Sequence, residues 1–207
     1  MALTRLGLNQ SINLATNTTG TLAVGNGGTG LASGTTGEFL KFTGSTTLAP
    51  AEAGGGITEV DQYRITSTFT GSSNPITSNW ERNDTVFDKI GTGMTQSSGN
   101  FTFPSTGIYK VEFNLPFSRN GNNQYSAIKI NVTTDNSSYT LRATSYGFIE
   151  EAGAETYSSV YAQTIVDVTD TSNVKVQFGV VNQAVCNFYG DTNANQAVAT
   201  FIRLGDT

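Results

Sequence analysis

Apolar and polar side chains alternate along the chain from about residue 60 onwards, in stretches of five to twelve positions. A period of two is the pattern of a β-strand that buries one of its faces. Ten segments show it: Tyr63–Thr70, Ile76–Trp80, Asn100–Phe103, Ile108–Phe117, Tyr125–Thr133, Tyr139–Phe148, Tyr157–Val168, Asn173–Val181, Ala184–Tyr189 and Gln196–Leu204. The intervening segments are rich in Gly, Pro, Asn, Asp and Ser, which favour turns. We therefore predict an all-β head over residues 60–207, a jelly-roll β-sandwich of about ten strands.

Residues 1–59 follow a different pattern. Glycine is frequent there, and only two of the 21 aromatic residues, Phe39 and Phe42, fall in this part. Each glycine costs conformational entropy on folding, and the few apolar side chains do not offset that cost within one chain. The apolar residues recur every few positions, so three chains side by side would bury them. We predict an extended trimeric stalk whose contacts include Leu22, Val24 and Leu31, with a disordered linker as the alternative.

The predicted domains follow from this contrast. Residues 1–20, with Leu6, Leu8, Ile12 and Leu14, form an N-terminal docking segment. Residues 21–59 form the Gly- and Thr-rich stalk, which ends in a hinge at Ala53-Gly54-Gly55-Gly56, and residues 60–207 form the head.

Composition supports β-structure and excludes several kinds of chemistry. Thr, Ser and Asn make up 69 of the 207 residues, a composition that suits strands and turns and not helices. The net charge is −5 without any basic cluster, so we expect no nucleic-acid partner. The chain has no histidine, which removes Ser-His-Asp triads and histidine-ligated zinc. No apolar run is long enough to span a membrane, and we expect synthesis in a host cytoplasm and no membrane insertion.

Residues 85–115, TVFDKIGTGMTQSSGNFTFPSTGIYKVEFNL, resemble the signature of the globular heads of complement-type collagenous proteins and tumour-necrosis-factor-like jelly rolls. The resemblance runs through Phe87, Asp88, Gly99, Phe101, Pro104, Gly107, Tyr109 and Phe113, and VATFIRLGD is similar to the closing strand of that family. The sequence departs from the family at Val111 and around Gly91–Met94. The resemblance implies a homotrimer, and in that packing we expect Tyr109, Tyr161 and Phe201 to face the three-fold axis.

Residues 21–50 resemble the glycine-rich stalk repeats of bacteriophage tail fibres, particularly at Val24–Gly30 and Gly37–Leu40. This resemblance implies a homotrimer on a virion, with its N-terminus docked on another virion protein and its head displayed for attachment to the host surface. A short capsid fibre or head decoration protein is the alternative. A third hypothesis is a polysaccharide depolymerase, although we expect no enzymatic activity.

Few residues suggest a reactive site. Glu150, Glu151, Glu155 and Asp191 are the densest acids of the head, and we interpret them as solvated loop charges, with a calcium site or glycosidase carboxylates as alternatives. Gly25–Gly30 fits G-x-G-x-x-G, but neither a strand before it nor a helix after it is predicted. We therefore expect no cofactor and no metal.

Two further residues are predicted to be structural. Cys186 alternates with polar neighbours and is expected to be a buried packing cysteine. Trp80 is expected to anchor the base of the head, and a surface groove is the alternative.

Two loops of the predicted head combine amides, charge and aromatic rings, which suit contact with saccharides. They run from Arg119 to Tyr125 and from Phe148 to Tyr157. Because surface loops vary without cost to the core, we predict receptor binding there to host polysaccharide or protein. The candidate residues are Arg119, Asn122, Asn123, Tyr125 and Tyr157.

Overall fold

The structure, a computed structural model, describes residues 38–44, 47–52, 56–85 and 87–207. It divides into two units between Gly56 and Ile57, and every regular element in the described part of the chain is a β-strand. The prediction of an all-β chain is therefore confirmed. The docking segment and the predicted stalk contacts Leu22, Val24 and Leu31 lie outside the described residues, as do residues 53–55 of the predicted hinge.

The described part of the first unit is an antiparallel hairpin of β1 (Glu38–Gly44) and β2 (Thr47–Glu52). The register pairs Leu40 with Pro50 and Phe42 with Leu48, so one face of the hairpin is apolar. Phe42 is 66% exposed on that face. Because an isolated two-stranded hairpin is at best marginally stable in water, this face requires a partner.

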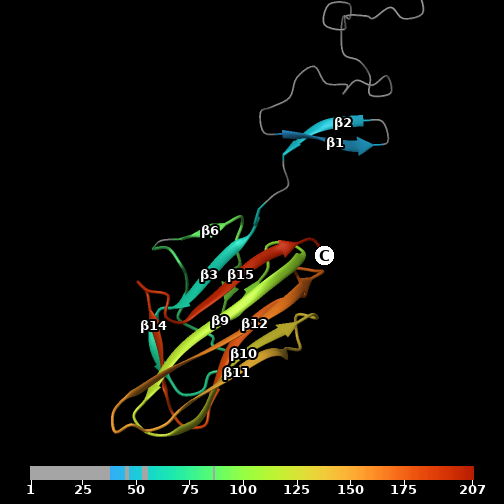
Figure 1. Ribbon diagram of the computed structural model, residues 1–207. Coiled ribbons are helices and arrows are strands. Elements are labelled where there is room, and N and C mark those ends of the chain that lie inside the picture. Colours follow the sequence, from blue (N-terminus) through green and yellow to red (C-terminus); the bar gives the residue numbers. More distant parts are fainter. Residues whose placement is uncertain (1–37, 45–46, 53–55, 86) are drawn as a thin grey trace, which may run out of the picture. The chain divides into compact units, whose positions relative to one another are not determined.

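The second unit, Ile57–Thr207, is the head, and it contains an eight-stranded antiparallel sheet (Figure 1). Its strands in spatial order are β4 (Ser67–Thr70), β14 (Asn187–Asp191), β9 (Gly107–Arg119), β15 (Val198–Gly205), β3 (Val60–Ile65) and β5 (Trp80–Arg82). In addition, β6 (Lys89–Ile90) pairs with β3, and β12 (Thr156–Val168) pairs with β9 along its whole length. The long β9 is thus the centre of this sheet.

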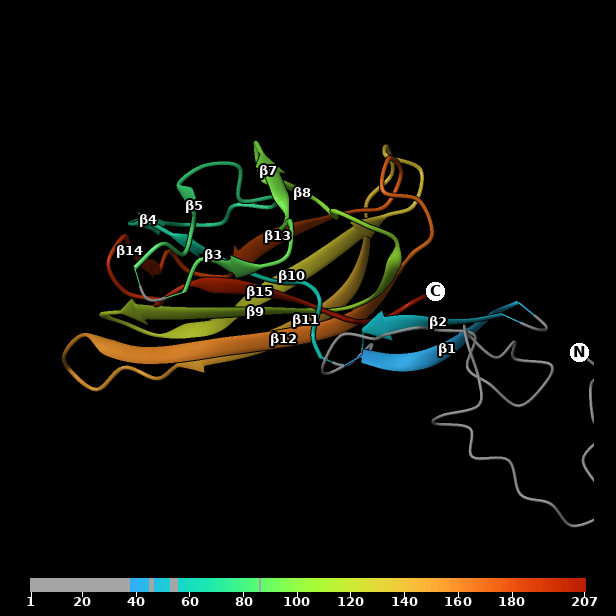
Figure 2. The same ribbon diagram turned by 90° about the horizontal axis from the view of Figure 1, so that it is seen from above.

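The second sheet of the head has five antiparallel strands. Their order is β11 (Thr140–Ile149), β10 (Asn123–Thr133), β13 (Lys175–Asn182), β8 (Asn100–Thr102) and β7 (Thr95–Ser97). In the described chain β11 pairs only with β10, and β12 only with β9, so each is an edge strand. Figures 1 and 2 both show β11 and β12 running next to each other.

An aromatic cluster fills the space between the two sheets. The ring of Phe101 lies 5.1–5.3 Å from the rings of Tyr63, Trp80, Phe178 and Phe201, measured between centroids. Strand β9 points every second side chain, from Tyr109 to Phe117, into this core. Each of these large rings removes roughly 150–250 Å² from water, so the cluster is a main source of the stability of the head.

A charged network covers the outer side of β3. Arg64 is only 1% exposed, and its guanidinium donates to Glu81 Oε2 at 3.1 Å, Asp84 Oδ1 at 2.6 Å and Asn83 Oδ1 at 3.2 Å. With Thr85 Oγ1, which accepts at 3.2 Å, four acceptors offset much of the cost of removing this cation from water. The outer side of the sheet at β3 is therefore already covered within one chain.

All ten predicted segments overlap a strand, but Ile76–Trp80 does so only at Trp80, the first residue of β5, and the rest of it is a loop. Ile76 N donates to Phe178 O, Trp80 Nε1 donates to Ile76 O, and Asn79 between them has a φ of 63°. The buried Ile76 and the partly buried Trp80, at the two ends of this loop, therefore gave the segment the appearance of an alternating strand. Strands β6 and β7, with two and three residues, are too short to show a period. Strands β1 and β2 fall in the part of the chain that was predicted only as an extended stalk.

Gly147 of β11 lies where the edge strands β11 and β12 of the two sheets pack closely against each other. A Cβ placed on Gly147 would lie 2.7 Å from Val160 Cγ1 of β12 and 3.2 Å from the ring of Phe117. We predict that Gly147→Ala lowers the free energy of unfolding by about 1–3 kcal/mol, because overpacking forces the strands apart. Gly205→Ala is the matched control, since a Cβ at Gly205 meets nothing within 4 Å. Chemical denaturation measures both, and equal stabilities would contradict the packing at this edge.

Candidate interaction surface

Large apolar side chains gather on the outward faces of β11 and β12. We define the β11–β12 surface by Tyr146 and Phe148 on β11 and Tyr157, Tyr161 and Ile165 on β12. Their exposed fractions range from 47% to 68%. Single exposed apolar residues are ordinary, but large apolar side chains on two edge strands mark a site of interaction. Strands β11 and β12 belong to different sheets whose inner faces meet at Gly147 and Val160, so Tyr146 and Phe148 point outwards from the five-stranded sheet and the other three residues point outwards from the eight-stranded sheet.

The outward position of these residues follows from the period of two. On β12 the alternate residues Val160, Ala162, Val166 and Val168 are buried, so Tyr157, Tyr161 and Ile165 point away from the core. The outward phase of β12 is mixed, because these three large side chains alternate with Ser159, Gln163 and Asp167. Of the five residues of the β11–β12 surface, only Tyr157 and Tyr161 were predicted from the sequence to make contacts.

Tyr161 lies within a polar group at the middle of this surface. Its hydroxyl donates to Glu112 Oε1 at 2.5 Å, and Lys110 Nζ lies 2.6 Å from the same oxygen. The hydrogen bond to the carboxylate raises the pKa of Tyr161 to about 12. Tyr161 is therefore protonated at neutral pH, and the ring has one fixed orientation on β12. Its predicted role in a subunit contact stays a prediction.

Tyr157 stands at the other end of β12, stacked on Tyr189 with ring centroids 5.8 Å apart. Tyr189 donates its hydroxyl to Glu155 Oε1 at 3.1 Å, and Ser118 Oγ, which also contacts the Tyr189 hydroxyl, donates to the same carboxylate oxygen. The hydrogen bonds from Ser118 and, after it, Tyr189 lower the pKa of the Glu155 carboxyl. Tyr157 remains 66% exposed. It belongs to the same outward face as Tyr161, four positions along the strand, so its predicted receptor role and the predicted subunit contact compete for one surface.

The structure brings the two predicted receptor loops together. Glu151 N donates to Asn122 Oδ1 at 2.7 Å, which joins the Phe148–Tyr157 loop to the Arg119–Tyr125 loop. Between them lies an open depression of about 440 Å³, lined by Asn122, Asn123, Gln124, Phe148, Ile149 and Glu150. A binding role for this depression stays a prediction.

Some of the predicted receptor residues serve the loops themselves. Asn123 is 1% exposed, donates to Ser126 Oγ and accepts from Ala184 N, so we correct its assignment: it is a structural residue. Its short amide side chain satisfies buried polar groups at the start of β10. Arg119 donates to the carbonyl oxygens of Asn122 and Val185. Tyr125 is half-exposed, and its ring lies 6.1 Å from that of Tyr146.

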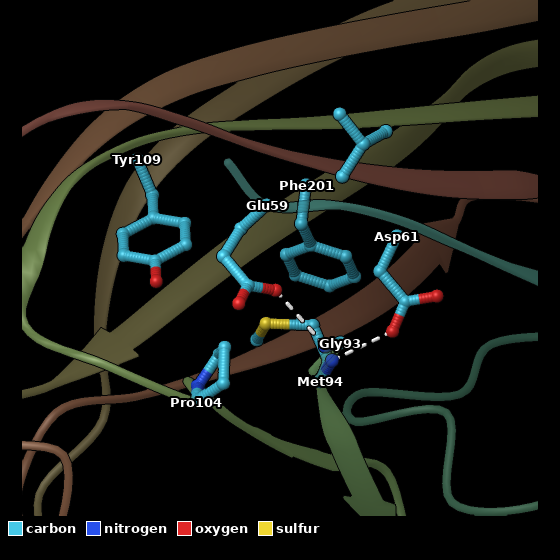
Figure 3. A pocket seen from close by; sticks show the side chains of 8 residues that line it. Glu59, Asp61, Gly93, Met94, Pro104, Tyr109 and Phe201 are labelled. Atoms are coloured by element: carbon cyan, nitrogen blue, oxygen red, sulfur yellow. Dashed lines mark hydrogen bonds between the residues drawn. The ribbon is translucent and has the colours of Figure 1, made fainter. Parts of the chain in front are cut away.

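Tyr109 and Phe201 are corrected as well, because both lie inside the head. Figure 3 shows their rings beside Pro104 and Met94, and the gap between these side chains is too small for a water molecule. Tyr109 donates its hydroxyl to Ser105 O at 3.1 Å and packs on Phe103. A period of two separates the faces of a strand without telling which is the inner one. These two rings therefore support the fold and do not reach another subunit.

The loop beside this gap is held by two carboxylates, also visible in Figure 3. Glu59 accepts from the backbone N–H groups of Thr92 and Gly93, and Asp61 accepts from that of Met94. Asp61 is buried and also binds Arg82 at 3.0 Å. Both carboxylates are thus engaged in hydrogen bonds that hold the Gly91–Met94 loop. This loop is the region where the sequence departs from the family that it resembles.

No metal-binding cluster is found among the described residues. Within residues 38–44, 47–52, 56–85 and 87–207, no three acidic or cysteine side chains lie close enough to hold a metal ion. A glycosidase acid needs a raised pKa, whereas the pKa of Glu155 is lowered. Cys186 is buried, as predicted. Trp80 packs against Phe101 and Phe113, which confirms its structural role. In the described part of the chain no helix is long and apolar enough to cross a membrane.

Comparisons with known proteins bear on the fold. No protein-family profile matches the sequence, and no curated protein matches it either. Among solved structures, the Eiger TNF of S. frugiperda is similar with a TM-score of 0.58 at 10% identity, covering 73% of this chain and 96% of that one. Murine APRIL at pH 5.0 gives a TM-score of 0.53 at 11% identity, covering 70% and 98%. At these identities the likeness concerns the fold alone, and the head is a tumour-necrosis-factor-like jelly roll.

Proposed function

We propose that the chain is a subunit of a homotrimeric phage virion appendage, which displays its jelly-roll head for attachment to the host surface. The observation that carries this proposal is the uncovered β11–β12 surface. A lone subunit leaves five large apolar side chains on two neighbouring strands in water. Association with copies of the same chain would remove these side chains from water without a second kind of protein.

The contact we propose joins the edge of one head to the flat sheet of the next. Tyr146 and Phe148 stand on the edge strand β11, whereas Tyr161 and Ile165 of β12 share the outer face of the eight-stranded sheet with the half-buried Val198 and Ile202 of β15. An edge against a face is a contact between two different patches. Such contacts form closed rings when the rotation between subunits closes, and three copies are the number that both sequence resemblances imply.

The first unit supports the same assembly independently. Among the described residues, nothing covers the apolar face of the β1–β2 hairpin, which carries Leu40, Phe42, Leu48 and Pro50. Three hairpins packed through this face would give the N-terminal stalk the apolar interior that each chain lacks. The resemblance of residues 21–50 to phage tail-fibre stalks supports a place on a virion.

Attachment by such an appendage is physical and needs no catalytic group. Three identical heads on one stalk convert a weak single site into useful adhesion, because linked sites gain roughly 10²–10⁴-fold in avidity. The loop depression at Asn122 and Phe148 is one place where a host saccharide or protein would be held.

The assembly is tested by mass and by one pair of substitutions. We predict that light scattering gives a mass near three times 21.9 kDa. We also predict that Ile165→Glu lowers the free energy of unfolding by more than about 2 kcal/mol per subunit, because the substitution places a charge in an apolar contact. Val185→Glu is the control, since Val185 is equally exposed but lies outside both strands. A surface substitution in a lone subunit changes stability by only about ±0.5 kcal/mol. A folded monomer at micromolar concentration, or equal stability of the two variants, would contradict the assembly.

The virion role is tested by electron microscopy of phage particles whose genome encodes the chain. The particles are labelled with an antibody against the head. We predict label at the free ends of fibres, and we predict that purified wild-type protein slows adsorption of the particles to host cells. Label spread over the capsid shell would favour the decoration alternative. Unlabelled particles would contradict the proposal.

A further inference from the structure

The outer face of the five-stranded sheet carries a polar hollow that no role above uses. Its volume is about 430 Å³, within the range of roughly 300–1,000 Å³ usual for small-molecule sites. The strand register explains how it forms, because Thr95 pairs with Thr102 and Thr102 with Lys175, while Ser97 pairs with Asn100. Strands β7, β8 and β13 therefore present adjacent rows of short polar side chains outwards.

The β10–β11 connection supplies the wall of the hollow. Tyr139 reaches over the sheet, and its hydroxyl donates to Asn100 Oδ1 at 2.6 Å. Gln177 Nε2 donates to the same oxygen at 2.8 Å. With Oδ1 doubly engaged, the amide of Asn100 has a fixed orientation. The ring of Tyr139 is likewise tied in place beside the hollow, so both groups are preorganised.

The polar groups of the hollow are unengaged within the described chain. No hydrogen bond or ion pair to another described residue involves the side-chain polar groups of Thr95, Ser97, Thr102 or Lys175, nor Asn100 Nδ2. Elsewhere on the head, hydroxyls such as those of Ser72, Ser118 and Thr133 have protein partners. Free donors and acceptors on three strands therefore converge on one space.

The charge of the hollow is positive in an acidic protein. Lys175 is the one charged residue among those that line it, whereas the whole chain carries −5. A single ammonium among several hydroxyls and an amide is a poor phosphate site, which usually has arginines or a run of backbone N–H groups. It matches a ring with several hydroxyls and one carboxylate.

We propose that this hollow binds an acidic sugar, a hexose ring that carries a carboxylate. Lys175 pairs with the carboxylate, Asn100 and the Ser and Thr hydroxyls exchange hydrogen bonds with the ring hydroxyls, and Tyr139 contacts the apolar face of the ring. The proposal gives the attachment function a ligand class and rests on that function for its biological role. The site centres on β7 and β8, at the opposite edge of the five-stranded sheet from β11, and the rest of the proposed subunit contact lies on β12.

Saturation-transfer NMR on the full-length protein tests the site with three probes: glucuronate, glucose and acetate. We expect glucuronate to bind about tenfold more tightly than glucose, and acetate to give no signal at the same concentration. Lys175→Gln should abolish the tenfold preference and leave glucose binding unchanged. Lys129→Gln is the matched control, because Lys129 points outwards from the same sheet but does not line the hollow.

Four results would overturn the inference: no binding of either sugar, equal binding of glucose and glucuronate, binding of acetate as tight as that of glucuronate, or an unchanged preference in Lys175→Gln. Light scattering on the same samples keeps the two proposals apart. A trimer that binds no sugar refutes the site alone, whereas a monomer that binds glucuronate refutes the assembly alone.

Discussion

A two-layer sandwich buries only one face of each of its sheets, and the opposite faces must be polar, covered by other segments of the chain, or covered by another molecule. On the eight-stranded sheet, the outer face is covered at β3 and uncovered at β12. At β3 the outer side is closed by Arg64 with Glu81, Asp84 and Asn83. At β12 nothing in the described chain covers Tyr157, Tyr161 and Ile165. The whole account of assembly follows from this difference.

The same requirement separates the roles of the two sheets. The eight-stranded sheet and the edge strand β11 carry the apolar side chains that association would remove from water. The outer face of the five-stranded sheet carries Tyr146 and Phe148 at β11, whereas at β7, β8 and β13 it is polar, with unengaged hydroxyls and one lysine around a hollow. Association through the first surface leaves the second free to meet a ligand, which suits a protein whose function is to hold a surface at several points.

Much of the fold was predictable because burial imposes a period of two on long strands. Strands β9 and β12 follow it closely, as do β10 from Ile128 to Val132 and β15 from Val198 to Ile202. The period does not say which phase faces inwards. Tyr109 and Phe201 were therefore assigned to a contact although they form core, and on β11 the small residues Ser145 and Gly147 face inwards while Tyr146 and Phe148 face out. The hollow was beyond prediction from the sequence, because it depends on the register between β7, β8 and β13.

Hydroxyl-radical footprinting of the intact protein tests most directly whether other copies cover the β11–β12 surface. The oxidation of Tyr157, Tyr161 and Phe148 is measured at two concentrations of the wild-type protein. One sample is undiluted, and the other is diluted until light scattering gives the mass of a single chain. The account predicts that these three rings react several-fold more slowly in the undiluted protein, while Val185 reacts equally in both. Equal reactivity of the three rings under both conditions would contradict it.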